Sequence, residues 1–231
     1  MNLKPGLGAL LAALACASCG VPRDPGGTLE RVRHGTLRVG IIASAPWVVP
    51  TGGEPRGVEV RLARDFAREL GASVRWVPGT EAELMEALEH SDVDVVIGGL
   101  DSRSPWKARA ALTRPYHTTR WRVGVRPSAA PPGELTGVRV AVRPGDPATP
   151  ELRRRGAVPV PAAEPGRAAG PAAGPDWLLP RWGLRETGPV LRERHHVMAV
   201  PPGENGFLVR LERFLRERGG EAGRLAREEA P

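Results

Sequence analysis

The feature that most constrains the fold of this chain is an alternation of strand-like and helix-like segments between residues 37 and 99. Short runs rich in β-branched residues lie at 37–42, 74–77 and 93–99. Two segments with helical spacing of apolar residues separate them, at 58–70 and 80–90. Thr80 and Glu83 have the spacing of a capping box at the start of the second helix. This order predicts a parallel sheet with right-handed crossovers and helices on its faces.

A ligand site is expected where the strands of this sheet end, because ligands of open α/β sheets bind beyond the carboxyl ends of the strands. The segments at that edge are 43–48 and 98–107. Candidate ligand-binding residues there are Trp47, Gly99, Asp101, Ser102, Arg103, Trp106 and Lys107. Two tryptophans among mixed polar groups suit a small-molecule pocket. The alternative for each tryptophan is packing in the core.

The second half of the chain is less regular. Strands are predicted at 121–125, 138–142 and 197–200, and helices at 176–184 and 205–218. Residues 161–175 consist almost entirely of Pro, Ala and Gly, a composition that favours irregular structure. We therefore expect no regular element there.

The N-terminal residues have the pattern of an export signal. Residues 1–19 contain one positive charge, Lys4, followed by an apolar stretch and small residues. Cys19 follows Ala-Ser and precedes Gly, as in the lipobox of bacterial lipoproteins, and Cys16 is the alternative lipidation site. Simple cleavage and secretion is the third possibility. Residues 20–35 would then tether the folded part, which has no other cysteine and so no disulfide.

The composition excludes several other classes of protein. The net charge is +7, but only two of the 33 basic residues are lysines, and the arginines are spread along the chain beside acidic residues. This pattern is typical of solvated mixed-charge surfaces, so we expect no nucleic-acid partner. His195 and His196 are adjacent and point to opposite faces of a strand, so they cannot chelate one metal together. We predict neither a metal nor a cofactor.

Residues 36–125 resemble the first lobe of bacterial extracellular solute-binding proteins of the amino-acid ABC-transporter type, family 3. The matching stretches are LRVG (37–40), GVEVRLARDFARELG (57–71), DVDVVIGGL (92–100) and LTRPY (112–116). The resemblance implies a two-lobed α/β fold like that of periplasmic binding proteins, each lobe a mainly parallel sheet flanked by helices. Lobe 1 would comprise 36–117 plus 197–231, and a reduced lobe 2 would comprise 118–196.

The resemblance also implies a function. The chain would be the substrate-binding lipoprotein of an ABC transporter, capturing a small polar solute, amino-acid-like or an amine, between lobes that close by hinge motion. Its partners would be that solute, an ABC permease and a lipid anchor. We expect a monomer in the cell envelope, membrane-anchored on the periplasmic or extracellular face, that binds its ligand without catalysis.

The amino-acid clamp implied by the family is altered in this chain. Trp106 occupies the position of the arginine that binds the ligand carboxylate, with Arg103 and Lys107 beside it. In lobe 2, Gly145 and Asp146 are followed by a proline, which has no N–H to donate. The acid that would hold the ligand ammonium has its nearest counterpart in Asp176.

Two interpretations of these changes remain open. In a re-specified pocket, Trp47 and Trp106 stack on a flat or cationic ligand, and Asp101 and Asp176 supply negative charge. In a degenerate one, lobe 2 has lost its cradle and the chain is a sensory or scaffold lipoprotein. A less favoured alternative is a dehydratase-like enzyme that uses Asp101, Glu59 and Asp176. The lytic transglycosylase domain of other relatives has no room before Pro231.

Overall fold

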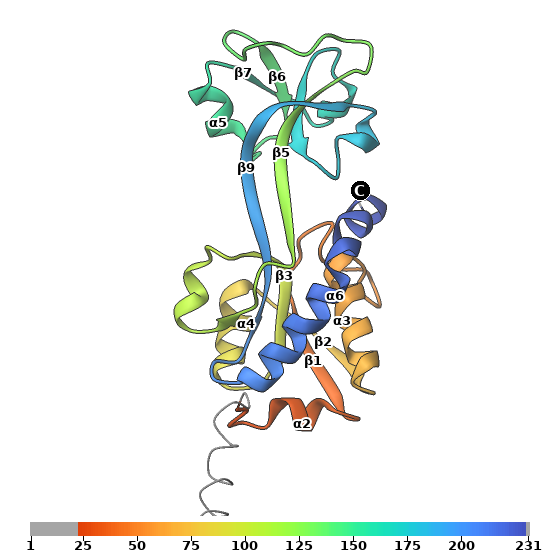
Figure 1. Ribbon diagram of the computed structural model, residues 1–231, viewed down its shortest axis with the longest axis vertical. Helices are drawn as coiled ribbons and strands as arrows, with labels where there is room; N and C mark the ends of the chain where they lie inside the picture. Colours follow the sequence, from red (N-terminus) through yellow and green to blue (C-terminus); the bar gives the residue numbers. More distant parts are fainter. Residues whose placement is uncertain (1–22, 230–231) are drawn as a thin grey trace, which may run out of the picture.

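The computed structural model describes residues 23–229, and the predicted signal segment with Cys16 and Cys19 lies outside the described residues. Two α/β lobes are joined by two long strands, β5 (His117–Val125) and β9 (Arg185–Val200), which run antiparallel side by side (Figure 1). We call residues 23–117 with 197–229 lobe 1, and residues 118–196 lobe 2. The predicted α/β two-lobed fold class is confirmed.

One mixed sheet passes through both lobes. Its strand order is β2-β1-β3-β9-β5-β8-β6-β7, with β4 paired to β9. The lobe 1 elements, apart from β9, are α2 (Thr28–Val32), β1 (Thr36–Ile41), α3 (Val58–Glu69), β2 (Ser73–Pro78), α4 (Glu81–Glu89), β3 (Val95–Asp101), the 3-10 helix η2 (Pro105–Ala108), β4 (Ala111–Leu112) and α6 (Asn205–Glu229). Those of lobe 2 are β6 (Arg139–Val142), α5 (Thr149–Arg154), β7 (Val158–Pro161), β8 (Ala172–Pro175) and the 3-10 helices η3 (Pro165–Arg167) and η4 (Pro180–Trp182).

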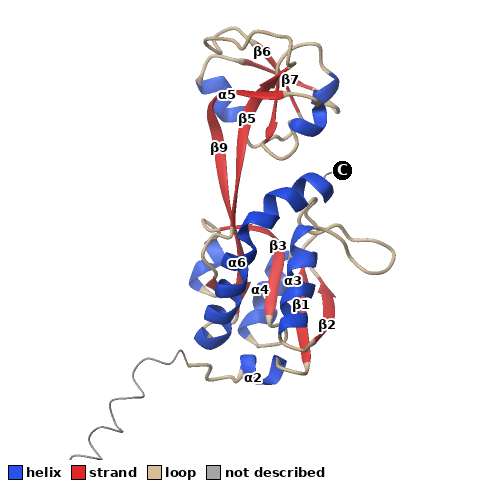
Figure 2. Ribbon diagram, turned by 45° about the vertical axis from the view of Figure 1, so that its right-hand side comes forward, coloured by secondary structure: helices blue, strands red, loops and turns tan. Residues whose placement is uncertain are grey.

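Lobe 1 has three layers, which follow from the alternation of side chains along β3. Val95 and Ile97 belong to the hydrophobic cluster on the face covered by α3 and α6 (Figure 2). Val96 and Leu100 point to the other face and join the cluster formed by α4. β1 pairs in parallel with β2 and β3, as the β-α-β-α-β pattern predicts. The capping box at Thr80 is also present.

Residues 23–33 are attached to lobe 1, although the sequence analysis treated them as part of a tether. The buried Glu204 carboxylate accepts hydrogen bonds from the N–H groups of Gly26 (2.6 Å) and Thr28 (2.9 Å). The Arg31 guanidinium forms an ion pair with the buried Asp94 at 2.6 Å. These contacts join residues that are 63 to 178 positions apart in the sequence, so the docking was not predictable from this segment.

Lobe 2 contains a strand in the segment for which we expected no regular structure. β8 is buried along its whole length, between β5 and β6. Its small residues let other groups approach closely, since a Cβ at Gly174 would lie 2.8 Å from Trp182. Pro171 precedes this strand and needs no N–H there, while its carbonyl accepts a hydrogen bond from Ala141 at 2.9 Å. The small residues of β8 therefore fit the close packing at this place, although their strand propensity is low.

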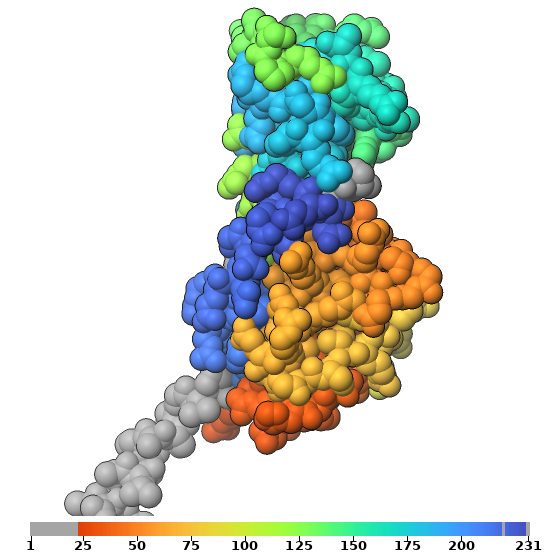
Figure 3. All heavy atoms as spheres, turned by 90° about the vertical axis from the view of Figure 1, so that its right-hand side faces the viewer, coloured from red at the N-terminus to blue at the C-terminus, as the bar shows by residue number. Residues whose placement is uncertain are grey.

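Helix α6 is longer than predicted and reaches lobe 2. Figure 3 shows its last turns lying against both lobes. Trp177 and Leu178 of lobe 2 share one hydrophobic cluster with Leu225 near the end of α6. The Arg181 guanidinium donates a hydrogen bond to the Arg227 carbonyl at 3.0 Å. Within residues 23–229, no helix has both the length and the apolar character needed to cross a bilayer.

Candidate functional site

A cavity of about 320 Å³ lies where β1 and β3 end and β9 enters lobe 1. Its position agrees with the rule that placed a site beyond the carboxyl ends of the strands. Its size is within the range of small-molecule pockets. The cavity is lined by Ile42, Ala43, Ser44, Glu81, Gly98, Gly99, Leu100, Asp101, Ser104, Pro105 and Arg194.

The floor of this cavity is a pair of glycines, Gly98 and Gly99, in the second half of β3. Gly98 has a φ angle of 151° and Gly99 one of 71°, both favouring glycine. A Cβ at Gly99 would lie 2.6 Å from Cδ1 of Trp47. Trp47 is buried and stacks on His196, with 3.8 Å between the ring centroids. Trp47 therefore supports the floor from beneath and does not line the cavity.

Glu59 holds the backbone of the same glycines. One carboxylate oxygen accepts hydrogen bonds from the N–H groups of Gly98 (2.6 Å) and Gly99 (2.9 Å). The other accepts one from the Tyr116 hydroxyl at 2.5 Å. Burial raises the pKa of this carboxyl, although all three hydrogen bonds act to lower it. Glu59 is fully buried and does not line the cavity, so the geometry gives it a positioning role instead of the catalytic one considered from sequence.

The loop after β3 forms the rim of the cavity. Burial alone would raise the pKa of Asp101, but hydrogen bonds from the Arg103 backbone and guanidinium, with the nearby charges of Arg103 and Arg194, lower it. Arg103 also donates to the Glu193 carbonyl of β9 at 2.7 Å. Ser102 donates its N–H to the His195 carbonyl at 2.9 Å. The rim is therefore fastened to the strand that leads to lobe 2.

Trp106 and Lys107 lie outside the lining of the cavity. Trp106 is on η2, half-buried against the cluster under α4, with the Arg109 guanidinium 5.5 Å from its ring centroid. Lys107 is exposed. Neither occupies the place that an arginine clamp would need in this cavity.

Arg194 is one of two charged lining residues, with Glu81, that the sequence analysis missed. It lies on β9, opposite Thr119 of β5, and its guanidinium is 5.9 Å from the ring centroid of Trp121. Its sequence neighbourhood is a run of charged and histidine residues in a hinge strand, without a motif. Only the pairing of β9 with β3 and β5 brings it to the end of β3.

The predicted residues of lobe 2 are not brought to this cavity. Asp146 accepts a hydrogen bond from the Ala148 N–H at 2.8 Å just before α5, and Gly145 is exposed beside it. Asp176 accepts one from the Trp177 N–H at 2.9 Å. Burial raises the pKa of both carboxyls. Neither carboxyl is among the groups that line the lobe 1 cavity.

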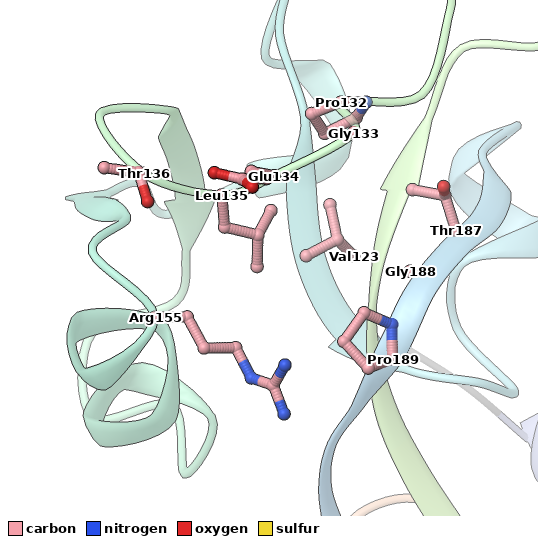
Figure 4. Close-up of a pocket in the computed structure, with 10 residues that line it drawn as sticks. All are labelled: Val123, Pro132, Gly133, Glu134, Leu135, Thr136, Arg155, Thr187, Gly188 and Pro189. Carbon is pink, nitrogen blue, oxygen red and sulfur yellow. The ribbon is translucent and has the colours of Figure 1, made fainter.

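A second cavity, of about 350 Å³, belongs to lobe 2 alone. It is lined by Val123, Pro132, Gly133, Glu134, Leu135, Thr136, Arg155, Thr187, Gly188 and Pro189. Figure 4 shows the apolar side chains of Val123, Leu135 and Pro189 on its wall, with Arg155 reaching in from the end of α5. The Arg155 guanidinium pairs with Glu151 at 2.6 Å, and the same carboxylate also pairs with Arg154.

Two histidines lie on the hinge strands, the half-buried His117 on β5 and the buried His196 on β9. Burial, with the charges of Arg120 and Arg227, lowers the pKa of His117 to about 4. Burial, with the charges of His117 and Arg194, lowers the pKa of His196 to about 3. Both are therefore neutral at neutral pH. Among residues 23–229, no group of three or more His, Cys, Asp or Glu side chains is placed to hold a metal ion.

Comparison with known proteins gives a family and several distant relatives. The family model described as bacterial extracellular solute-binding proteins, family 3, matches residues 37–219. Among solved structures, the unliganded open L-cystine solute receptor of Neisseria gonorrhoeae has a TM-score of 0.69, with 18% identity over 84% of this chain and 92% of that one. An ancestral cationic amino acid solute-binding protein has a TM-score of 0.70, with 20% identity over 88% of this chain and all of that one.

A curated relative carries an enzyme name. Membrane-bound lytic murein transglycosylase F of Vibrio cholerae is 34% identical over 94 residues, which are 39% of this chain but only 17% of that protein. A second structure of the ancestral protein describes it as a precursor of cyclohexadienyl dehydratase. These findings correct the prediction that the chain is not an enzyme. A fold of this kind carries both binding and catalysis, so binding alone could not be read from it.

Proposed function

Because this chain belongs to the bacterial extracellular solute-binding proteins, family 3, we propose that it captures a small polar solute, amino-acid-like or an amine, between its lobes. The observation that carries this proposal is the cavity at the ends of β1 and β3, with a lining of backbone, hydroxyl and charged groups. Pockets with a few convergent polar groups are typical of small-molecule sites. Closure of lobe 2 on the hinge strands would then bring Asp146 and Asp176 toward the bound solute.

The proposal also includes a place in the cell. We propose that the chain works on the periplasmic or extracellular face, attached through a lipid on Cys19 and delivering its solute to an ABC permease. The family supports the location, and the N-terminal sequence supports the anchor. Metabolic labelling with a fatty-acid analogue tests the anchor, because replacing Cys19 by alanine should abolish labelling, whereas replacing Cys16 should not.

Thermal unfolding of residues 20–231 against a panel of solutes tests the binding function. The panel contains amino acids, polyamines, quaternary amines, organic acids and short peptides. A ligand at 100 times its dissociation constant adds about 2.7 kcal/mol of stability. We expect one chemical class to raise the midpoint by several degrees, as roughly 2–4 °C accompanies each kcal/mol in domains of this size. A flat response from a folded protein would contradict the proposal and favour a scaffold role.

A second candidate function is recognition of a fragment of murein. Its support is that the curated relatives that match part of this chain are named membrane-bound lytic murein transglycosylase F. The stem peptides of murein carry both amino and carboxylate groups, and they belong in the same panel. A midpoint shift with these peptides but not with free amino acids would favour this candidate.

A further inference from the structure

We infer that Arg194, on the hinge strand β9, binds the carboxylate of the solute in the lobe 1 cavity, so that the ligand is an acid or a zwitterion. This inference rests on the proposed solute-binding function and adds the chemical class of the ligand. It also places the positive group of the site on the connection between the lobes, away from the loop after β3.

The first support is that, within the described residues, the Arg194 guanidinium forms no ion pair and no side-chain hydrogen bond, and only lies near the charge of Asp101. Among residues 23–229 no acidic side chain lies within ion-pair distance of its guanidinium. Its Nε atom is buried and has no hydrogen-bond acceptor. Leaving a buried charged donor unpaired is costly, and a ligand carboxylate would remove that cost. The guanidinium suits this because it can donate two parallel hydrogen bonds to one carboxylate.

The second support is that the two charged groups on the rim, Asp101 and Arg103, are paired with each other. Asp101 forms an ion pair with Arg103, at 3.4 Å between Nη2 and Oδ2. Arg103 also donates to the Glu193 carbonyl and does not line the cavity. Arg194 therefore supplies the unbalanced positive charge of the cavity. The stacking of its guanidinium over Trp121 limits its motion and presents its edge.

The third support is Glu81 on the same cavity. Glu81 lies at the start of α4, lines the cavity and forms no ion pair or side-chain hydrogen bond within the described part of the chain. One guanidinium and one carboxylate, both without partners, match a solute that carries a carboxylate and an ammonium. A zwitterion therefore fits this lining better than a polyamine.

Matched pairs of ligands and variants test the role of Arg194. Isothermal titration would compare L-arginine with agmatine, L-lysine with cadaverine and L-histidine with histamine, and would include succinate as a plain acid. In the wild-type chain we expect the acid-bearing member of at least one pair to bind about 10- to 100-fold more tightly, as charge-assisted hydrogen bonds allow. Arg194→Gln should reduce that ratio to near one, and Arg194→Lys should keep part of it.

Arg192→Gln is the matched control, because Arg192 is exposed on the same strand and does not line the cavity. It should leave the ratio unchanged. If solutes bind but the decarboxylated amines bind as well as the acids, or if Arg194→Gln keeps the ratio, the inference is wrong while solute binding stands. If the folded wild-type chain binds no member of the panel, both fail. If Arg194→Gln does not fold, the wild-type ratio and Arg194→Lys decide.

Discussion

At the scale of single residues, the site depends on close contacts that a sequence motif does not specify. The strand that contains Gly98 and Gly99 was recognised from sequence, and a cavity lies at the edge of the sheet where a ligand site was expected. The roles of individual residues were not recognised from sequence. Trp47, a candidate ligand-binding residue, supports the glycines from below. Arg194 was missed because β-strand pairing over long sequence distances brings it there.

Replacing Gly99 by alanine should destabilise the fold. The residue has a positive φ, and the added Cβ would lie 2.6 Å from Trp47. Strain of this kind costs about 1–3 kcal/mol. Urea unfolding should show that loss for Gly99→Ala, whereas Gly53→Ala, whose Cβ would meet nothing within 4 Å, should change the unfolding free energy by less than about 0.5 kcal/mol. Equal losses of unfolding free energy in the two variants would show that Trp47 and the backbone at Gly99 can shift to accommodate the added methyl group.

The two histidines on the hinge strands should make stability fall in mild acid. Their folded-state pKa values, about 4 for His117 and about 3 for His196, are below the ordinary value of 6.5. The unfolded chain therefore binds more protons below pH 6.5, and acid favours unfolding. Each histidine should remove about 1.4 kcal/mol per pH unit between pH 6.5 and about 4.

Urea unfolding between pH 7.5 and 4.5 measures this effect. His117→Gln should make the loss of unfolding free energy less steep by the contribution of one group. His90→Gln, at an exposed site, should leave the slope as it is in the wild type. A wild-type chain whose stability does not change over this range would show that both histidines are protonated in the folded state at ordinary pH values.

At the scale of elements, periodic segments were predicted well and the hinge was not. The helices at 58–70 and 80–90 and the strands of lobe 1 follow from apolar spacing and agree with α3, α4 and β1–β3. β9 extends far beyond the predicted 197–200. The rest of the strand was missed because its charged residues show no strand pattern. β8 was missed because Ala, Gly and Pro have low strand propensity.

The end of α6 should stabilise the arrangement of the two lobes. Leu225 is buried in the cluster that also contains Trp177 and Leu178 of lobe 2. Leu225→Ala should lower the unfolding free energy by about 2–5 kcal/mol, as is usual for a buried leucine. Val209→Ala, at an exposed position of the same helix, is the control and should cost less than about 0.5 kcal/mol. A similar small loss in both variants would mean that this contact does not contribute to stability.

At the scale of the whole molecule, the central claim is that the two lobes close on a solute. The two-lobed architecture could be anticipated from the family resemblance, because the order of strands and helices in lobe 1 was clear. That Asp146 and Asp176 do not line the lobe 1 cavity could not be anticipated, because the local sequence pattern does not determine the angle between the lobes. Two antiparallel strands and the end of α6 are the connections about which the angle would change.

A distance measurement between the lobes tests this claim most directly. Residues 20–231 contain no cysteine, so Ala108→Cys and Arg153→Cys, both at exposed positions, would place one spin label on each lobe. With a ligand identified by the thermal panel, the account predicts that the distance distribution shortens and narrows, because a ligand that contacts both lobes favours the closed state. An unchanged distribution at saturating ligand would contradict closure and restrict binding to lobe 1.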